Sequence, residues 1–241
     1  MASLGIVEGG ARWLVDCTPD FPEQLRRLGG GPLAGILLTH AHMGHYTGLL
    51  HLGPEAWAPE AVDVHVMPGM RGFLEGNAPW CALMSEGHVV LRDLVADQPL
   101  PITPSVRAVP RLVPHRGPWS ETVGFEIVGP RRTVLFVPDI DRWSDWSRDI
   151  ATLLEEVDVA YVDGSFFDAN ELPWRDPGAI RHPFVRATMD RLQPLPPELR
   201  ARVRFLHLNH TNPALREGTA AWREVHERGF SVAVEGEEVE L

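Results

Sequence analysis

The run Thr39-His40-Ala41-His42-Met43-Gly44-His45-Tyr46-Thr47-Gly48-Leu49 places three histidines within six residues, in a chain with 11 histidines among 241 residues. It directly follows Ile36-Leu37-Leu38, an apolar run that predicts a buried strand. Alternate side chains of an extended segment point the same way, so His40 and His42 can bind one metal ion. His45, just past a turn, can serve a second ion or support the first. The alternative is a solvated histidine-rich loop. We interpret the run as a metal site because so many histidines stand in so few residues.

Further imidazoles and a carboxylate also stand where an apolar run ends. His115 follows Leu112-Val113, Asp139 follows the run from Val134 to Val137, and His207 follows Phe205-Leu206. In open α/β architectures, ligands collect at the carboxyl ends of strands. Neutral imidazole and carboxylate suit Zn²⁺, Fe²⁺ or Mn²⁺. If these strand ends share one edge, the sequence predicts a metal centre there.

Strands and helices alternate along the chain, and hairpins occur among them. The patterns predict strands over residues 3–7, 13–15, 36–38, 62–66, 89–91, 106–109, 124–128, 133–137, 159–162 and 203–206. They predict helices over residues 20–28, 69–74, 144–157, 184–192 and 214–228, with residues 170–183 as a loop. This mixture favours an α/β sandwich of two mixed sheets with outer helices over one parallel sheet. We expect a single domain over residues 1–241.

Composition limits the kinds of partner. The formal net charge is −11 and no basic run stands out, which argues against binding to nucleic acid. A small anionic substrate stays compatible, because a metal can supply local positive charge. Cys17 and Cys81 form no close-spaced motif, so neither a disulfide framework nor a thiolate zinc site is indicated. No apolar run approaches the ~18 residues of a membrane span, so we expect a cytoplasmic protein without a membrane partner. The sequence does not indicate an oligomeric state.

The run from Thr39 to Leu49 resembles the signature of the metallo-β-lactamase-fold superfamily, usually His-x-His-x-Asp-His after a strand. Val113-Pro114-His115, Val137-Pro138-Asp139 and the segment His207 to Pro213 resemble its later motifs, in the same order. Ser120 to Phe125 and His207 to Pro213 are most similar to the branch of pyrroloquinoline quinone biosynthesis protein B. The resemblance implies a four-layer αββα sandwich of two mixed β-sheets flanked by helices.

The resemblance also implies a ligand set. A first ion would be held by His40, His42 and His115, with an open position for water. A second ion would lie near His45, with Asp139 bridging and His207 completing the site. Zn²⁺ is the expected metal, as one or two ions, with Fe²⁺ or Mn²⁺ as alternatives.

The sequence departs from the family pattern in two places. Gly44 stands where the superfamily usually has an Asp that binds the second metal and handles a proton of the attacking water. The second site is therefore empty, weak, or rebuilt by Asp141, Asp163 or His210. The chain also starts at what corresponds to the second strand of the family.

Three further residues are candidates for the site. His210 competes with His207 as the last ligand, and otherwise we expect it to face the substrate in a catalytic role or to cap the helix at Pro213. His182 lies in a loop that could fold over the site and bind substrate. Arg116, beside His115, could pair with a substrate anion or form a salt bridge with a local carboxylate. Neither a phosphate-binding P-loop nor a serine nucleophile elbow is present.

The reaction that these residues favour is metal-assisted hydrolysis of an ester, amide or phosphodiester in a small molecule. A bound metal lowers the pKa of its water from ~15.7 towards ~7. Asp139 is the best candidate to orient that water or accept its proton. One alternative is an iron-dependent oxidative enzyme of the quinone-cofactor-biosynthesis type, which the resemblance implies would use Fe²⁺ and O₂. Another is a non-catalytic member that binds metal or a ligand.

Overall fold

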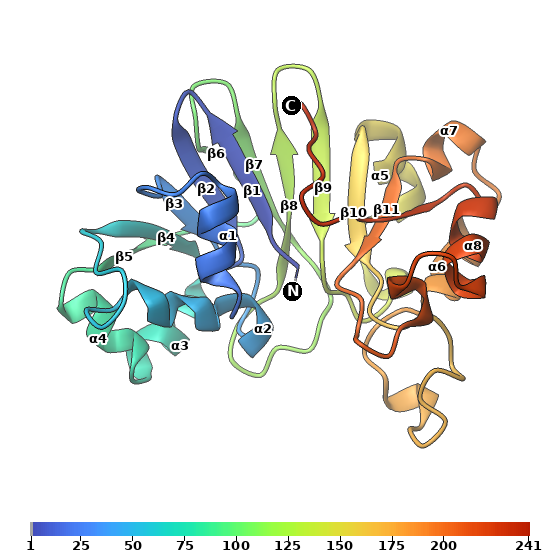
Figure 1. Ribbon diagram of the computed structural model, residues 1–241, viewed down its shortest axis with the longest axis horizontal. Helices are drawn as coiled ribbons and strands as arrows, with labels where there is room; N and C mark the ends of the chain where they lie inside the picture. Colours follow the sequence, from blue (N-terminus) through green and yellow to red (C-terminus); the bar gives the residue numbers. More distant parts are fainter. Residues whose placement is uncertain (1) are drawn as a thin grey trace. The chain divides into compact units, whose positions relative to one another are not determined.

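The computed structural model describes residues 2–241, which divide into two compact units (Figure 1). Unit 1 contains the residues up to Leu112 together with Gly117–Val123. Unit 2 contains Val113–Arg116 and Gly124–Leu241. Each unit has its own β-sheet strands, its own helices and its own hydrophobic core.

The sheet of unit 1 has the strand order β1-β2-β3-β4-β5. These strands are β1 (Leu4–Glu8), β2 (Ala11–Val15), β3 (Gly35–Leu37), β4 (Val62–Val66) and β5 (Val89–Asp93). The first two form an antiparallel hairpin, and β2 to β5 run parallel. Gly9 and Gly10 close the hairpin with φ values of +57° and +90°, which glycine adopts without strain. Two further strands, β6 (Leu100–Pro101) and β7 (Arg107–Leu112), pair antiparallel.

Helices of unit 1 cover one face of this sheet. They are α1 (Phe21–Arg27), α2 (Met43–Tyr46), the 3-10 turn η1 (Thr47–Leu52), α3 (Pro68–Gly76) and α4 (Trp80–Ser85). Figure 1 shows α1 in front of the strands. Phe21 of α1, Leu49 of η1 and Met70 of α3 are buried in one core cluster with Ile36 and Val64 of the sheet. Removal of this apolar area from water is what holds the short helices in place.

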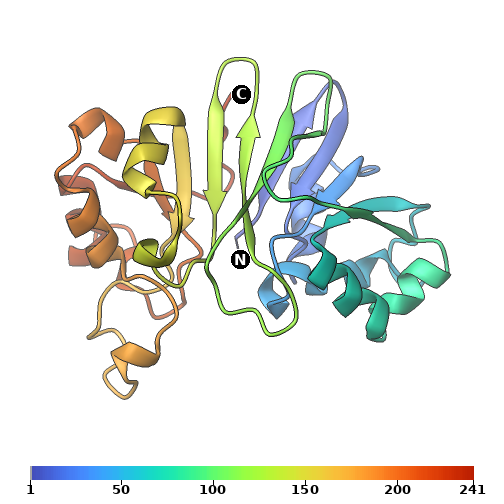
Figure 2. The same ribbon diagram turned by 180° about the vertical axis from the view of Figure 1, so that it is seen from behind.

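The strands of unit 2 follow the order β12-β11-β10-β9-β8. They are β8 (Val123–Val128), β9 (Thr133–Val137), β10 (Val159–Asp163), β11 (Val203–Leu206) and β12 (Ser231–Val232). The β8–β9 pair is antiparallel, and β9 to β12 run parallel. The helices are α5 (Ile150–Glu156), α6 (Val185–Leu192), α7 (Pro197–Arg200) and α8 (Ala220–Glu227), with 3-10 turns η2 (Trp143–Asp145), η3 (Pro177–Ala179) and η4 (Pro213–Leu215). Helices α5, α6 and α8 bury their apolar sides against β9, β10 and β11 (Figure 2).

Two of the predicted helices are shorter than the sequence pattern suggested. The helix predicted over 144–157 begins at Ile150, because Trp146 is extended (φ −79°, ψ 132°) and Asp149 caps the helix by accepting from the Ala151 N–H. The helix predicted over 214–228 begins at Ala220. Gly218 adopts φ +78°, and the Thr219 hydroxyl caps the helix by accepting the Trp222 N–H.

Other predicted elements lie within a few residues of their observed bounds, and the predicted loop over 170–183 contains only the short turn η3. The sequence patterns did not indicate several short elements, each of six residues or fewer, namely α2, η1, α4, β6, α7 and β12. Between residues 2 and 241, no helix is both long and apolar enough to cross a membrane.

Parallel strands bring their carboxyl ends to one edge within each unit. In unit 1, β2 ends just before Asp16, and β3 leads through Leu38 and Thr39 to His40. In unit 2, β9 leads to Asp139, β10 ends with Asp163, and β11 ends just before His207. Each unit therefore gathers polar side chains at the carboxyl edge of its parallel strands.

Candidate metal centre

The three histidines of the opening run lie side by side in unit 1. The ring centroids of His40 and His42 are 4.6 Å apart, and those of His40 and His45 are 4.3 Å apart. His42 is the N-cap of α2, so this short helix turns the chain back and places His45 beside His40. The predicted proximity of the three imidazoles is therefore present within unit 1.

A buried carboxylate, Asp16, fixes two of these imidazoles. Its Oδ1 accepts the Thr39 N–H at 2.8 Å, and its Oδ2 accepts the Thr39 hydroxyl at 2.9 Å and lies 2.7 Å from His45 Nδ1. The Thr39 Oγ1 lies 2.9 Å from His40 Nδ1. Because Thr39 uses its one proton on Asp16, His40 Nδ1 must donate to Thr39. Both imidazoles therefore carry their proton on Nδ1 and keep the Nε2 lone pair for a metal.

The backbone of Asp16 is held in a strained conformation. Its φ is +63°, in the left-handed region that costs a non-glycine residue roughly 1–2 kcal/mol. Asp16 was not among the residues identified from the sequence. The rule that identified Asp139, an acidic residue directly after a buried strand, also fits Asp16, which follows the buried residues Leu14 and Val15.

Three contacts fix the backbone of the run from Thr39 to Leu49. The Ala41 N–H donates to the Ser120 hydroxyl at 2.9 Å, and the Val123 N–H donates to the Thr39 carbonyl at 3.0 Å. The Gly48 N–H donates to the Cys17 carbonyl at 2.9 Å, and a Cβ at Gly48 would lie 2.1 Å from the Thr18 carbonyl oxygen. The close approach at Gly48 therefore requires glycine.

In unit 2, two candidate metal ligands, His115 and His207, lie beside the carboxylate of a third, Asp139. His115 Nε2 lies 3.7 Å from Asp139 Oδ1, and His207 Nε2 lies 3.7 Å from Asp139 Oδ2. This separation is too long for a hydrogen bond. It is near the roughly 3.4 Å expected between two ligands on a tetrahedral ion with bonds of ~2.0–2.1 Å. The arrangement within unit 2 therefore fits a metal ion.

The three imidazoles of unit 2 that lie near Asp139 each have an oxygen close to Nδ1. His115 Nδ1 lies 2.9 Å from Asp141 Oδ1, and His207 Nδ1 lies 3.0 Å from Ser165 Oγ. His182 Nδ1 lies 2.7 Å from Asp163 Oδ2. Such oxygen partners, which set the tautomer and the ring orientation, are typical of metal-binding histidines.

Asp163, the last residue of β10, contacts three other segments of unit 2. Besides contacting His182, its carboxylate accepts the Ile140 N–H at 3.1 Å and the Ser165 N–H at 2.9 Å. It is fully buried. Asp141 and Asp163 were candidates to rebuild a second metal site; the structure places both against the Nδ1 atoms of histidines.

The electrostatic environments of His115 and His182 differ. Burial lowers the pKa of His115, against the opposing charge of Asp139, so this imidazole is neutral at pH 7 and can bind metal. Burial also acts to lower the pKa of His182, but the charge and hydrogen bond of Asp163 outweigh it and raise that pKa. His182 Nδ1 lies 3.7 Å from Asp139 Oδ1, so this histidine, predicted to bind substrate, lies beside the candidate ligand Asp139.

The structure separates the remaining candidates. His207 adopts φ +61° directly after β11 and reaches Asp139, whereas His210 is exposed and, within residues 2–241, has no contact with the Asp139 cluster. The Arg116 N–H donates to Asp141 Oδ1 at 3.2 Å. Its exposed side chain forms no ion pair within the described part of the chain, so the salt bridge considered as an alternative is not formed.

Residues 11–226 match the family model described as the beta-lactamase superfamily domain. The coenzyme PQQ synthesis protein B of Ruegeria pomeroyi is 26% identical over 273 residues, covering 100% of this chain and 88% of that protein. The protein of the same name from a Methylobacterium species is 27% identical, covering 98% of this chain and 85% of that protein.

Solved structures show the same fold. The zinc-bound PqqB of Methylobacterium extorquens superposes with a TM-score of 0.83 at 20% identity, covering 100% of this chain and 87% of that chain. A diphosphatase of the PhnP family superposes with a TM-score of 0.65 at 18% identity, covering 96% and 80%. These similarities confirm the resemblance seen in the sequence and the predicted α/β fold class of two mixed sheets flanked by helices.

Proposed function

The chain belongs to the beta-lactamase superfamily, and from this premise we propose that it is a metal-dependent enzyme that hydrolyses a small molecule. One observation carries the proposal. Four imidazoles, those of His40, His45, His115 and His207, each have an oxygen atom within 3.0 Å of Nδ1. Where the oxygen accepts the Nδ1 proton, as at His45 and His40, Nε2 is left as the ligand atom, and imidazole Nε2 suits zinc.

The proposed ligands are the residues predicted from the sequence, namely His40, His42, His115, His45, Asp139 and His207. When bound, the metal supplies a Lewis acid and an acidified water. Asp139 is buried and faces the Nε2 atoms of His115 and His207, so its carboxylate is the group that orients this water or accepts its proton. Asp16 and Asp141 keep the imidazoles oriented.

A second candidate function is an oxidative step in the synthesis of a quinone cofactor. Two observations favour it. Relatives named coenzyme PQQ synthesis protein B align with the whole chain, and Gly44 removes the carboxylate that usually helps to activate water. A coordination position left open in this way suits Fe²⁺ chemistry with O₂. Gly44 also keeps a non-catalytic, metal-binding role as a third candidate.

Metal content and turnover of matched variants test the proposal. We expect His42→Ala, in unit 1, and His115→Ala, in unit 2, each to lose bound metal. Each variant should also lose hydrolysis of ester, amide and phosphodiester test substrates. His226→Ala, which changes an exposed histidine on α8, should keep both. Hydrolysis that persists in a variant without metal would contradict the proposal. Iron in anaerobically purified protein, with O₂ uptake and no hydrolysis, would favour the oxidative function. The absence of any turnover would favour the non-catalytic, metal-binding role.

A further inference from the structure

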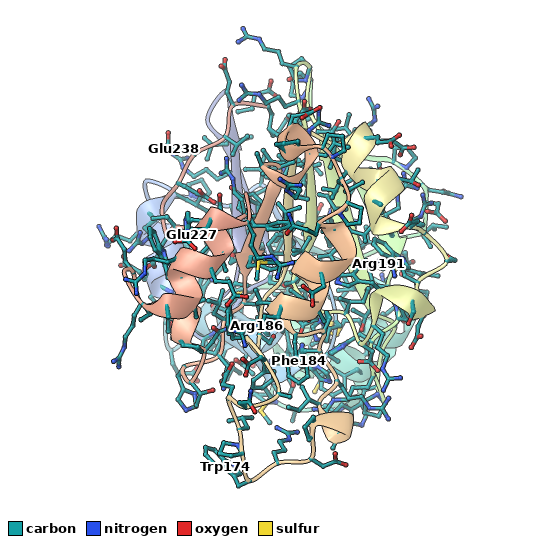
Figure 3. The ribbon with its side chains drawn as sticks, turned by 90° about the vertical axis from the view of Figure 1, so that its right-hand side faces the viewer. Trp174, Phe184, Arg186, Arg191, Glu227 and Glu238 are labelled. Atoms are coloured by element: carbon teal, nitrogen blue, oxygen red, sulfur yellow. The ribbon has the colours of Figure 1, made fainter. Side chains whose placement is uncertain are left out.

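A cleft of about 370 Å³ opens in unit 2, within the size range of small-molecule sites. It lies between the segment after β9 and the loop that leads into α6. Its lining includes Asp141, Arg142, Trp143, Ile180, His182 and Phe184. Figure 3 shows Phe184 and Arg191, at the two ends of α6, above the loop that carries Trp174.

Two residues that line the cleft also contact proposed metal ligands. Asp141 lies 2.9 Å from His115 Nδ1, and His182 lies 3.7 Å from Asp139. A molecule in the cleft would therefore present one end to His182 and the Asp139 cluster. From this position, which rests on the proposed function, we propose that the cleft binds the substrate and that the substrate is a small carboxylic acid whose apolar body carries the hydrolysable bond.

The charge of the cleft points to an anion. Arg142 is exposed, and within residues 2–241 its guanidinium forms no ion pair. The other lining arginine, Arg191, is paired with Asp149 at 2.9 Å. The carboxylate of Asp141 is engaged by His115 and by the Arg116 N–H. Arg142 is thus the cleft's uncompensated cation, and a guanidinium binds a carboxylate through two parallel hydrogen bonds.

The walls of the cleft are apolar and are held by their own packing. The Trp143 indole N–H donates to the Thr188 hydroxyl at 2.9 Å, which fixes the ring. Ile180 is buried in a cluster with Phe166 and Leu172, and Phe184 packs against the same cluster. An apolar wall beside the guanidinium of Arg142 favours a ligand with an apolar body and an anionic end.

Binding of 4-fluorophenylacetate, followed by ¹⁹F NMR on the zinc-loaded chain, tests the proposal. We expect the acid to bind the unmodified chain at least tenfold more tightly than 4-fluorophenylacetamide does. Arg142→Gln should weaken binding of the acid at least tenfold and leave the amide unchanged. Arg223→Gln, which removes an exposed arginine of α8 that does not line the cleft, should change neither. Ala187→Phe, which fills the cleft from α6, should weaken both ligands.

Since a carboxylate can also bind zinc, the same titration is repeated with His42→Ala. If the cleft binds the acid, His42→Ala retains the dependence on Arg142 whether or not the chain is a hydrolase. Equal affinity of Arg142→Gln and the unmodified chain would overturn the proposal. So would binding that disappears in His42→Ala while Arg142→Gln retains it, since that pattern shows coordination to the metal alone.

Discussion

The Asp16 carboxylate holds His45 directly and His40 through the Thr39 hydroxyl, so a change at Asp16 affects both imidazoles. In Asp16→Asn, the amide NH₂ would replace one acceptor oxygen and meet donors at Thr39 or His45. We expect zinc affinity to fall about 10–100-fold, the usual effect of losing such a support, and the free energy of unfolding to fall by about 1–3 kcal/mol. Competition with a chelator measures the first and urea unfolding the second. Asp20→Asn, at the exposed start of α1, is the control, and equal zinc affinity in the two variants would refute the role.

At His207, the energetic cost of the backbone conformation can be measured separately from the contribution of the imidazole side chain. Its φ is +61°, which glycine adopts freely and alanine does not. In metal-free protein, we expect His207→Gly to be more stable than His207→Ala by about 1 kcal/mol, although both lack the side chain. Urea unfolding of the two variants measures the difference. An alanine variant as stable as the glycine variant would show that the conformation relaxes at no cost.

At the residue scale, the sequence identified the proposed ligands because each stands in the histidine run or directly after an apolar run. It did not identify which oxygen supports which ring. The contact of Asp16 with His45 spans 29 positions, and that of Ser165 with His207 spans 42. Such pairs depend on the register between strands and on side-chain rotamers, which periodicity does not encode.

Among the secondary-structure elements, η1 depends on Gly48. A Cβ there would lie 2.1 Å from the Thr18 carbonyl oxygen, so the turn or the segment before α1 must shift. We expect Gly48→Ala to lower the free energy of unfolding by about 1–3 kcal/mol. Gly72→Ala is the matched change, since Gly72 lies inside α3 with nothing within 4 Å of its would-be Cβ. Gly72→Ala should be more stable than the unmodified chain by about 0.5–1 kcal/mol. Thermal melts in which Gly48→Ala is the more stable of the two variants would contradict the packing described.

Element boundaries were predictable where apolar periodicity and a stop signal coincide, as for β4, β9 and α6. They failed where a buried apolar residue outside a helix continued the helical spacing. Trp146 continues the spacing of α5, yet it is extended and joins the core through its own side chain. The short 3-10 turns also escaped prediction, because one turn presents too few positions for a period to be recognised.

For the whole molecule, bound zinc should act as a stabiliser, because it binds the folded chain and has no comparable site in the unfolded one. At free zinc ~100-fold above its dissociation constant, the gain is about 2.7 kcal/mol, which corresponds to about 5–10 °C in Tm for a chain of this size. We expect a chelator to lower the Tm by this amount, as measured by scanning calorimetry. His42→Ala should show no such drop, and an unchanged Tm in the unmodified chain would refute tight binding.

The left-handed backbone at Asp16 and His207 has a practical consequence for engineering. At both positions, a change to glycine would relieve a conformational penalty while deleting a group assigned to the metal centre. In a selection for thermostability carried out without metal, the glycine variant at His207 would therefore be favoured although it lacks a proposed ligand, whereas at Asp16 the lost hydrogen bonds to Thr39 and His45 oppose the gain. Any campaign to make this chain robust should hold both residues fixed or screen for metal retention alongside stability.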